Sequence, residues 1–319
     1  MSTIDQAAER LAQLRKAGVD THGLAPVGDV SPGDAAPREP VPVRAVKELS
    51  SGQQRLLSEA RETTQPIPVA ADSAPALRRV DIDFARLSAS GYITPHAPRS
   101  RLAEEFRVVK RPLLMNARGK STSPVLFANR IMVTSSLPSE GKTFVSVNLA
   151  MSIAMELDTH VLLVDADAAR PSVLTRLGLP PSKGLLDLLI EPGLDPSEVV
   201  LATNVERLSI LPAGTQQERA TELLASESMS KLIERLASDN PTRIVLVDSP
   251  PLLASTESRV LAAHMGQVIV VIEADRTPQN TVAEALAAVE NCPVVMTLLN
   301  KAPANESGSY YGSYGSYGT

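Results

Sequence analysis

The sequence contains few aromatic residues and almost no cysteine. Aromatic side chains make up 3% of its 319 residues, tryptophan is absent, and Cys292 is the single cysteine. One cysteine cannot form an internal disulfide, so a buried apolar core has to stabilise the fold, and a reducing compartment suits such a chain. The hydrophobic fraction of 43% is sufficient for a substantial core.

Long apolar runs and an excess of positive charge are also missing. No stretch of about 18 or more apolar residues occurs, and the first residues lack the apolar segment of a signal peptide. The net charge of −5 argues against non-specific nucleic-acid binding as the main activity, so we expect no nucleic-acid partner. These absences predict a soluble, cytoplasmic protein whose association with a membrane would go through a partner.

The first 99 residues are rich in proline and poor in periodic apolar segments. Ile4 to Val19 fits a short amphipathic helix, and the sequence leaves open whether it docks a partner or is a frayed terminal helix. From about Thr21 to Arg99, prolines recur in segments that cannot bury enough apolar surface to offset chain entropy. Residues 1–99 are therefore predicted to be a mostly disordered leader, with order resuming near Ser100.

Beyond Ser100, short apolar strands alternate with segments of helical periodicity. Strands are expected at 131–134, 161–164, 207–214, 244–247, 267–274 and 293–301, and helices at 144–157, 184–189 and 219–237. Strands that are apolar on both faces are typical of a parallel sheet covered by helices on both sides. The predicted fold class is α/β, with a mostly parallel sheet, over residues 100–304.

The most informative stretch is RIMVTSSLPSEGKT, from Arg130 to Thr143. It nearly fits the phosphate-binding pattern G-x-x-x-x-G-K-[ST] and has the strand, loop and helix that this pattern requires, which makes the fold P-loop NTPase-like. Backbone N–H groups at the helix start would face the phosphates of ATP, Lys142 would reach the terminal phosphates, and the Thr143 hydroxyl would ligate Mg²⁺. The residues expected to hold the nucleotide here are Ser139, Glu140, Gly141, Lys142, Thr143 and Phe144.

One position of this loop departs from the pattern. Ser136 stands where the pattern has its first glycine. Because a residue with a Cβ adopts positive φ only at a cost, we expect the loop to turn differently at Ser136 or to be strained there.

Carboxylates follow two of the predicted strands. VLLVDADAARP places Asp165 and Asp167 at one strand end, and RIVLVDSPP places Asp248 at another. Ligands of open parallel sheets lie beyond the carboxyl ends of the strands, so these side chains are expected near the phosphates, where Asp165 and Asp248 could bind Mg²⁺. One of Asp165 and Asp167 can instead be a turn former or a helix cap.

The two ends of the predicted domain carry further features. In SRLAEEFRVVKRPLL, helical spacing places Leu102, Phe106, Val109 and Leu113 on one face and Glu104, Arg107, Lys110 and Arg111 around the other.

The last residues, SGSYYGSYGSYGT, cannot pack a core and predict a flexible tail over 305–319. This tail is either a sticky low-complexity segment or a tether that carries tyrosine hydroxyls to the nucleotide site, and the scarcity of aromatics elsewhere favours the tether.

Taken in order, SSLPSEGKT, VLLVDADAARP, IVLVDSPP and the terminal tyrosines resemble the bacterial tyrosine kinases of polysaccharide synthesis and export. More narrowly, the chain is similar to the soluble autokinases associated with exosortase and exopolysaccharide gene clusters. The resemblance covers about Ser100 to the C-terminus. It implies a deviant-Walker P-loop domain, related to the septum-site and partitioning ATPases, that uses ATP and Mg²⁺ to phosphorylate tyrosine.

The resemblance also implies roles for individual residues. Lys142 and the loop backbone would hold the phosphates, and Thr143 and Asp248 would organise Mg²⁺. Asp165 or Asp167 would orient or deprotonate the tyrosine hydroxyl. Asn300, which ends the last strand, would contact the adenine. The acceptor residues would be Tyr310, Tyr311, Tyr314 and Tyr317.

The helix motif E-x-x-R-x-x-R of the family falls on Glu104, Arg107 and Lys110 and implies a ring-like homo-oligomer that presents one subunit's tail to its neighbour's site. Lysine at the third position departs from the motif, and lysine does not replace the bidentate contacts of arginine. Ser139, where the family loop has glycine, and Ala169, where the family often has arginine, are further departures. A membrane-bound chain-length or export adaptor protein is the implied partner, which would recruit the chain to the inner membrane face.

Two other functions remain open from the sequence. A partitioning or site-selecting ATPase of the same fold would carry a lysine five positions before Lys142, where this chain has Leu137, and would lack the tyrosine tail. A non-enzymatic nucleotide-binding regulator of a polysaccharide export complex would use the tail for contacts alone. A GTPase is disfavoured because Asn300-Lys301 is not followed by the aspartate that would bind guanine.

Overall fold

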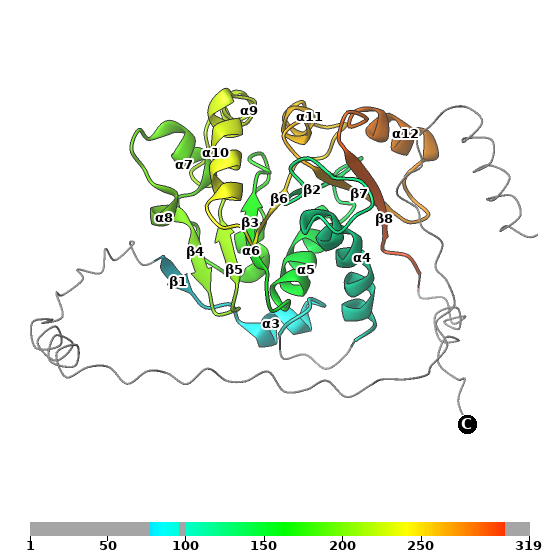
Figure 1. The fold of residues 1–319 in the computed structure, drawn as a ribbon, viewed down its shortest axis with the longest axis horizontal. Helices are drawn as coiled ribbons and strands as arrows, with labels where there is room; N and C mark the ends of the chain where they lie inside the picture. Colours follow the sequence, from blue (N-terminus) through cyan, green and yellow to red (C-terminus); the bar gives the residue numbers. More distant parts are fainter. Residues whose placement is uncertain (1–76, 96–99, 304–319) are drawn as a thin grey trace, which may run out of the picture. The chain divides into compact units, whose positions relative to one another are not determined.

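The computed structural model describes residues 77–95 and 100–303 (Figure 1). Within them the strands are β1 Arg78–Val80, β2 Arg130–Ser135, β3 His160–Asp165, β4 Leu201–Thr203, β5 Leu208–Leu211, β6 Arg243–Asp248, β7 Gln267–Glu273 and β8 Val294–Asn300. The helices are α3 Phe84–Ala89, α4 Arg101–Ala117, α5 Lys142–Ala154, α6 Val173–Leu177, α7 Leu185–Ile190, α8 Pro196–Val199, α9 Ala220–Leu224, α10 Glu227–Ser238, α11 Glu257–Ala262 and α12 Gln279–Ala287. The expected leader up to residue 76 and the expected tail from residue 304 lie outside the described residues.

The strands form one sheet in the order β1-β4-β5-β3-β6-β2-β7-β8. Every neighbouring pair is parallel except β4 and β5, which are antiparallel. The prediction of an α/β fold with a mostly parallel sheet is confirmed. Because β2, β3 and β6 are adjacent and parallel, their carboxyl ends meet at the same edge of the sheet.

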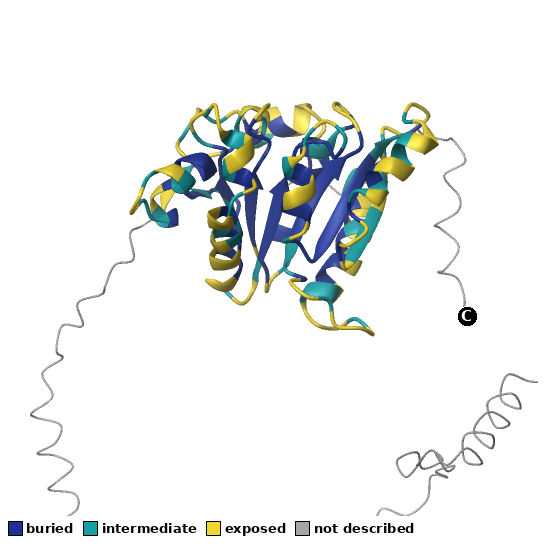
Figure 2. Cartoon of the chain, turned by 90° about the horizontal axis from the view of Figure 1, so that it is seen from above, coloured by how far each residue is buried: buried dark blue, intermediate teal, exposed yellow. Residues whose placement is uncertain are grey.

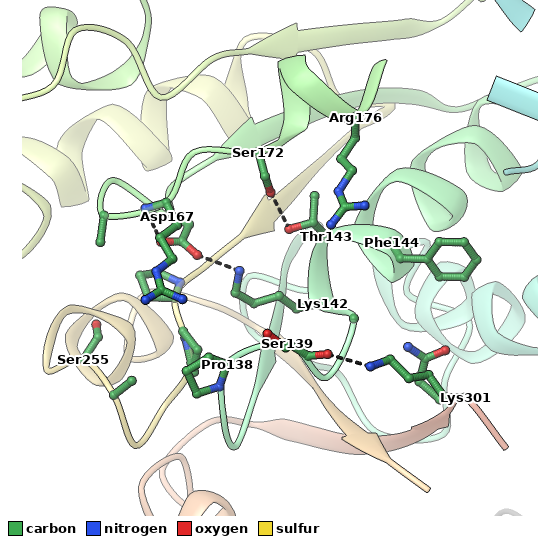
Figure 3. Close-up of a pocket in the computed structure, with 17 residues that line it drawn as sticks. Pro138, Ser139, Lys142, Thr143, Phe144, Asp167, Ser172, Arg176, Ser255 and Lys301 are labelled. Atoms are coloured by element: carbon green, nitrogen blue, oxygen red, sulfur yellow. Dashed lines mark hydrogen bonds and ion pairs between the residues drawn. The ribbon is translucent and has the colours of Figure 1, made fainter. Parts of the chain in front are cut away.

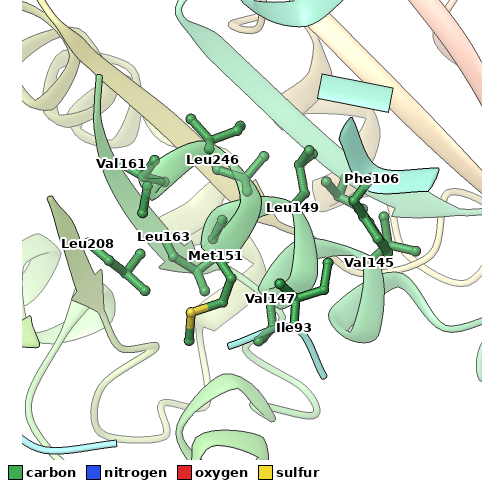
Figure 4. Packing of buried hydrophobic residues seen from close by; sticks show 14 of the residues in the cluster. Ile93, Phe106, Val145, Val147, Leu149, Met151, Val161, Leu163, Leu208 and Leu246 are labelled. Carbon is green, nitrogen blue, oxygen red and sulfur yellow. The ribbon is translucent and has the colours of Figure 1, made fainter. Parts of the chain in front are cut away.

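Helices cover both faces of this sheet, as predicted. Alternate residues of β2 point to opposite faces: Ile131 and Val133 belong to one buried cluster, and Met132 belongs to the other. Leu149 and Met151 of α5 pack in the first cluster with Phe106 of α4 (Figure 4). The central strands are consequently buried on both sides (Figure 2).

The edge strand β8 does not share this burial. Its seven residues are intermediate or exposed, and Leu299 is 63% exposed. The expected coverage is only partial here: Met296 and Leu298 pack against one buried cluster and Val295 against the other, and none of them is fully buried. β8 is an edge strand of the described sheet, paired with β7 alone.

Order begins earlier than the sequence indicates. Residues 77–95 are placed, with β1 pairing with β4 and Asp83 capping α3 through the backbone N–H groups of Ala85 and Arg86. This segment then contacts α5, because the Ile93 N–H donates to Asn148 Oδ1 over 2.7 Å. Its apolar side chains are isolated in the sequence, and they join the buried cluster that also contains the apolar side chains of α5. The predicted boundary at Ser100 was therefore wrong for residues 77–95.

Two helix predictions also need correction. The single helix expected from Arg219 to Ala237 is divided into α9 and α10, because Ser226 adopts extended backbone and its hydroxyl accepts from Met229 N–H as the N-cap of α10. On α4, Lys110 does not lie on the charged exposed face. It is 5% exposed, and its ammonium donates to the Ser152 carbonyl and pairs with Glu156.

Candidate active site

The loop between β2 and α5 holds the backbone conformation that a phosphate site requires. Gly141 is the N-cap of α5 with φ of 100°, and a Cβ at this position would lie 2.1 Å from Asn300 Nδ2. Asn300 Nδ2 donates to the Glu140 carbonyl over 2.8 Å, so the end of β8 holds this loop. Only glycine satisfies both the positive φ and the close approach of Asn300.

The strained residue of the loop is Ser139. Its φ is 71°, whereas Ser136 is not among the positive-φ residues and is fully buried. Of the two alternatives for Ser136, the structure agrees with a different turn, because Ser136 does not adopt positive φ, and the strained position of the loop is Ser139. Lys301, at the end of β8, donates from Nζ to the Ser139 carbonyl over 2.8 Å and stabilises this conformation.

Ser139→Gly is expected to stabilise the free protein by roughly 0.5–1 kcal/mol, because glycine adopts positive φ without steric cost. This gain exceeds the opposing effect, which is the larger conformational entropy of glycine in the unfolded chain. Denaturant unfolding measures the change. Ser123→Gly is the matched control, since Ser123 is an exposed loop serine that is not among the positive-φ residues. This control is expected to be neutral or destabilising, and equal effects from the two variants would contradict strain at Ser139.

Glu140 shapes the loop from inside. Its carboxylate is 2% exposed, accepts from the Leu137 N–H over 2.6 Å and accepts from the Thr277 hydroxyl. The side chain does not line the pocket described next. Glu140 contributes to the site through the backbone that it orders.

A pocket of about 820 Å³ opens over the start of α5 (Figure 3). At its base, Lys142 Nζ lies 2.6 Å from Asp167 Oδ2, and both side chains are largely buried. Asp167 also accepts from the Arg170 N–H. The lining includes Pro138, Ser139, Gly141, Thr143, Phe144, Ser172, Arg176, Ser255, Asn300 and Lys301. The site therefore places a cation and a carboxylate together beside the helix N-terminus.

Thr143 and Asp248 lie next to this ion pair. The Thr143 hydroxyl donates to Asp248 Oδ2 over 2.6 Å, and Ser146 donates to Oδ1 over 2.9 Å. Ser172 donates to Thr143 Oγ1 over 2.9 Å. A hydroxyl and a carboxylate beside a phosphate loop are hard oxygen donors, which fit Mg²⁺ that keeps water and phosphate oxygens as its other ligands. Sequence reasoning missed Ser146 and Ser172, since isolated serines carry no pattern.

Asp165 is directed toward the backbone. Its Oδ2 accepts from the N–H groups of Ser172 and Val173, each over 3.0 Å, and its Oδ1 accepts from the Asp167 N–H over 3.3 Å. Asp165 thereby holds the chain between β3 and α6, and it does not line the pocket. Of the two aspartates that the sequence left open, Asp167 is the one that faces the pocket.

The buried carboxyls have a strong tendency to hold protons. Burial raises the pKa of Asp165 to about 7, and the nearby Asp248 carboxylate acts in the same direction. Burial likewise raises the pKa of Asp248 to about 6, against the opposing effect of the Lys142 ammonium. Because burial disfavours the charged form of these carboxyls, a divalent cation bound beside Asp248 would stabilise its ionised form.

The remaining predicted site residues lie elsewhere. Glu104 and Arg107 form an exposed ion pair on α4 with a separation of 2.6 Å. The four tyrosines that the sequence predicts as acceptors lie outside the described residues, and Lys301, close to where the described chain ends, lines the pocket. Among residues 77–95 and 100–303, no helix combines the length and hydrophobicity that crossing a bilayer requires.

Residues 131–296 match the model of a protein family described as AAA domain, which is just over half of the chain. The tyrosine-protein kinase CpsD of Streptococcus agalactiae is 33% identical over 195 residues, which cover 60% of this chain and 82% of CpsD. The tyrosine-protein kinase YwqD of Bacillus subtilis (strain 168) is 28% identical over 222 residues, which cover 70% of this chain and 89% of YwqD. The succinoglycan biosynthesis transport protein ExoP of Rhizobium meliloti (strain 1021) is 32% identical over 71% of this chain, which spans only 28% of ExoP.

Solved structures agree with these relatives. The VpsO kinase domain superposes with a TM-score of 0.54 at 28% identity and covers 63% of this chain and 96% of that domain. The BceF tyrosine kinase domain also has a TM-score of 0.54, at 25% identity, and the match covers 69% of this chain and 91% of that domain. Both the phosphate-loop geometry and these similarities lead to the same conclusion: the chain belongs to the family of bacterial tyrosine-protein kinases built on a P-loop, AAA-type domain.

Proposed function

We infer that this chain is a Mg-ATP-dependent protein-tyrosine kinase that phosphorylates its own C-terminal tyrosines. The observation that carries this proposal is the Lys142–Asp167 pair at 2.6 Å on the pocket floor, where α5 begins. A lysine at that position binds the terminal phosphates of a nucleotide, and a neighbouring carboxylate can take the proton of an attacking hydroxyl. The names of CpsD and YwqD, both tyrosine-protein kinases, support the same reaction.

In this reaction the tyrosine hydroxyl oxygen forms a bond to the γ-phosphorus while the bond from that phosphorus to the β,γ-bridging oxygen breaks. ADP leaves, and Asp167 accepts the phenolic proton. Lys142 and the backbone N–H groups at the start of α5 hold the phosphates and stabilise the charge that develops on them. Mg²⁺, when bound, neutralises phosphate charge, and Thr143 and Asp248 would hold it. Asp165 keeps the β3–α6 connection in place through its backbone contacts.

We assign the acceptor role to Tyr310, Tyr311, Tyr314 and Tyr317. Lys301 lines the pocket, and Tyr310 follows it in the sequence, which supports the tyrosine segment as a substrate within reach of the site. Transfer between subunits would need self-association, for which Glu104 and Arg107 offer an exposed charged surface on α4. Lys110 serves this surface only indirectly, because its ammonium is bound within the subunit and fixes α4 against α5.

The wider setting follows from the relatives. ExoP is named for succinoglycan biosynthesis transport, which supports a role for this chain in the synthesis or export of an exopolysaccharide. A cytoplasmic kinase recruited to the inner membrane face by a membrane-bound adaptor would fit such a role. The adaptor is the proposed partner besides a second copy of the chain.

Incubation of the purified protein with Mg-ATP, followed by phosphotyrosine detection and an assay for ADP, tests this function. A kinase yields phosphotyrosine together with ADP. An ATPase of the partitioning type yields ADP and free phosphate without phosphotyrosine, and a nucleotide-binding regulator yields neither. Either of the last two results would overturn the proposed activity.

Asp248→Asn is expected to weaken nucleotide binding at least tenfold in Mg²⁺ while leaving binding in EDTA nearly unchanged. The reason is that Asp248 and Thr143 supply the protein's hard oxygen donors for the metal, whereas the phosphates are held by Lys142 and the loop. Calorimetric titration with ADP in the two buffers measures the difference. Asp239→Asn, which makes the same change at an exposed residue, is the control. An equal loss in both buffers would show that Asp248 is structural.

A further inference from the structure

A second pocket of about 450 Å³ adjoins the phosphate pocket. The two pockets share Phe144, Ser172 and Arg176, so they are contiguous. Figure 3 shows these three shared residues beside the start of α5. The second pocket is closed by residues from the segment that precedes α4, a segment that the sequence did not mark as structured. Its other lining residues are Arg86, Ser90, Tyr92, Pro171 and Thr175.

Two arginines line this pocket without a carboxylate partner. Within the described residues, neither Arg86 nor Arg176 takes part in an ion pair. Arg86 lies against Gly178, where a Cβ would be 2.5 Å from Nη1, so the absence of a side chain at Gly178 leaves room for this guanidinium. Two guanidinium groups facing one cavity create a positive potential that an anion would neutralise.

Tyr92 adds a buried polar group to the lining of this pocket. Its side chain is buried, with the residue 6% exposed, and its hydroxyl forms no well-aligned hydrogen bond in the described chain. Burial raises the pKa of this hydroxyl, and the Arg176 guanidinium opposes that rise through its charge and through its approach to the phenol oxygen. The ring packs against Phe144 with 5.0 Å between centroids. An unpaired buried hydroxyl is costly, so it suits a ligand that accepts its hydrogen bond.

We propose that Arg86, Arg176 and Tyr92 form a second anion subsite, beside the phosphate loop, that binds a phosphotyrosine side chain of the C-terminal tail. The arginines would bind the phosphate oxygens, and Ser90 and Thr175 offer further hydroxyl donors. Phe144 and Pro171 supply apolar surface for the phenyl ring. A tail that already carries one phosphate would thereby stay near the active site while its other tyrosines react.

The geometry favours this ligand over the nucleotide itself. The nucleotide phosphates have Lys142 and the α5 N-terminus as donors in the first pocket, whereas Arg86 lines only the second. Residues 304 to 309 separate the described chain from Tyr310, and at about 3.3–3.6 Å per residue they allow a reach of roughly 20 Å. This inference rests on the proposed function, since it takes the product of that reaction as its ligand.

A synthetic peptide of residues 305–319 with phosphate on Tyr314, titrated in saturating Mg-ADP, tests the subsite. The phosphopeptide is expected to bind at least tenfold more tightly than the unphosphorylated peptide. Arg86→Gln and Arg176→Gln are each expected to remove most of this preference. Arg79→Gln, which removes the same charge from an exposed position outside both pockets, should retain it.

Tyr92→Phe adds a readout that does not depend on the arginines. It is expected to leave the thermal stability of the free protein unchanged or higher, because an unpaired buried hydroxyl is removed, and to weaken phosphopeptide binding severalfold. Equal binding of the two peptides by the wild-type protein, or equal affinity in wild type and both arginine variants, would overturn the subsite. So would a loss of Mg-ADP affinity in Arg176→Gln that matches the loss of phosphopeptide affinity. The peptide is synthetic, so an inactive kinase would not affect this result.

Discussion

Lys142→Ala protein incubated with Mg-ATP is expected to form no detectable phosphotyrosine, a loss of at least a hundredfold to a thousandfold in rate. Lys142 is the one lysine on the pocket floor at the start of α5, and its ammonium is largely buried, so solvent cannot replace its charge. Mass spectrometry and phosphotyrosine detection measure the effect. Lys183→Ala, which removes an exposed lysine paired with Glu191, is the control and should keep full activity.

The same substitution has a structural consequence that must be separated from the catalytic one. Without Lys142, the buried Asp167 carboxylate loses its partner, so thermal stability is expected to fall. The double variant Lys142→Ala/Asp167→Ala removes both charges and should recover much of that stability while staying inactive. Wild-type phosphotyrosine levels in a folded Lys142→Ala protein would contradict the assignment of this loop as the phosphate site.

The sequence predicted the parts of the site that recur as patterns. GKT after an apolar strand located Lys142 and Thr143, and aspartate after four aliphatic residues located Asp248. These residues lie together because adjacent parallel strands have their carboxyl ends at the same edge of the sheet, and β2, β3 and β6 are adjacent. The sheet and its covering helices could be predicted for the same reason, since buried strands need apolar residues on both faces.

The parts that could not be predicted depend on contacts between distant residues. The contacts that hold the loop at Ser139 and Glu140 come from Lys301 and Asn300 at the far end of the chain, although the glycine of the family loop at position 139 was a local signal for the positive φ of Ser139. Ile93 belongs to the core through contacts with residues far along the chain, including Asn148 of α5, which accepts its N–H. Because Lys110 is charged, the sequence predicted that it is exposed. It is buried because its aliphatic stem packs in the interior and its ammonium donates a hydrogen bond to the Ser152 carbonyl. No local pattern in the sequence records such partners.

Asp165 and Asp167 illustrate the limit within a single motif. The spacing placed both carboxylates at the end of one strand and left open which of them acts. Backbone hydrogen bonds distinguish them: Asp165 accepts three N–H groups, whereas Asp167 meets Lys142 in the pocket. The choice depends on how the chain turns after β3, which the sequence of two aspartates does not encode by itself.

Changing Tyr310, Tyr311, Tyr314 and Tyr317 to phenylalanine is expected to remove nearly all autophosphorylation and to leave ATP binding intact. Of the five tyrosines in the chain, only Tyr92 would remain, and its side chain is buried against Phe144. Ser309 to Thr319 contains only glycine, serine, tyrosine and threonine, so deleting it should change thermal stability very little. Phosphopeptide mapping by mass spectrometry provides the measurement, and phosphate found only outside these four tyrosines would refute the tail as the substrate.

A mixing experiment then decides whether the transfer occurs between subunits. Lys142→Ala protein with an intact tail supplies acceptors but no activity, and wild-type catalytic residues without residues 309–319 supply activity but no acceptors. If the tail reaches a neighbouring site, the Lys142→Ala protein becomes labelled in the mixture at a rate that rises with the concentration of active protein. Each phosphate adds about −1.5 to −2 charges, so several on one tail should repel each other and the acidic site and loosen the assembly. Labelling that occurs only in wild-type chains, at a rate independent of concentration, would show instead that each subunit phosphorylates its own tail.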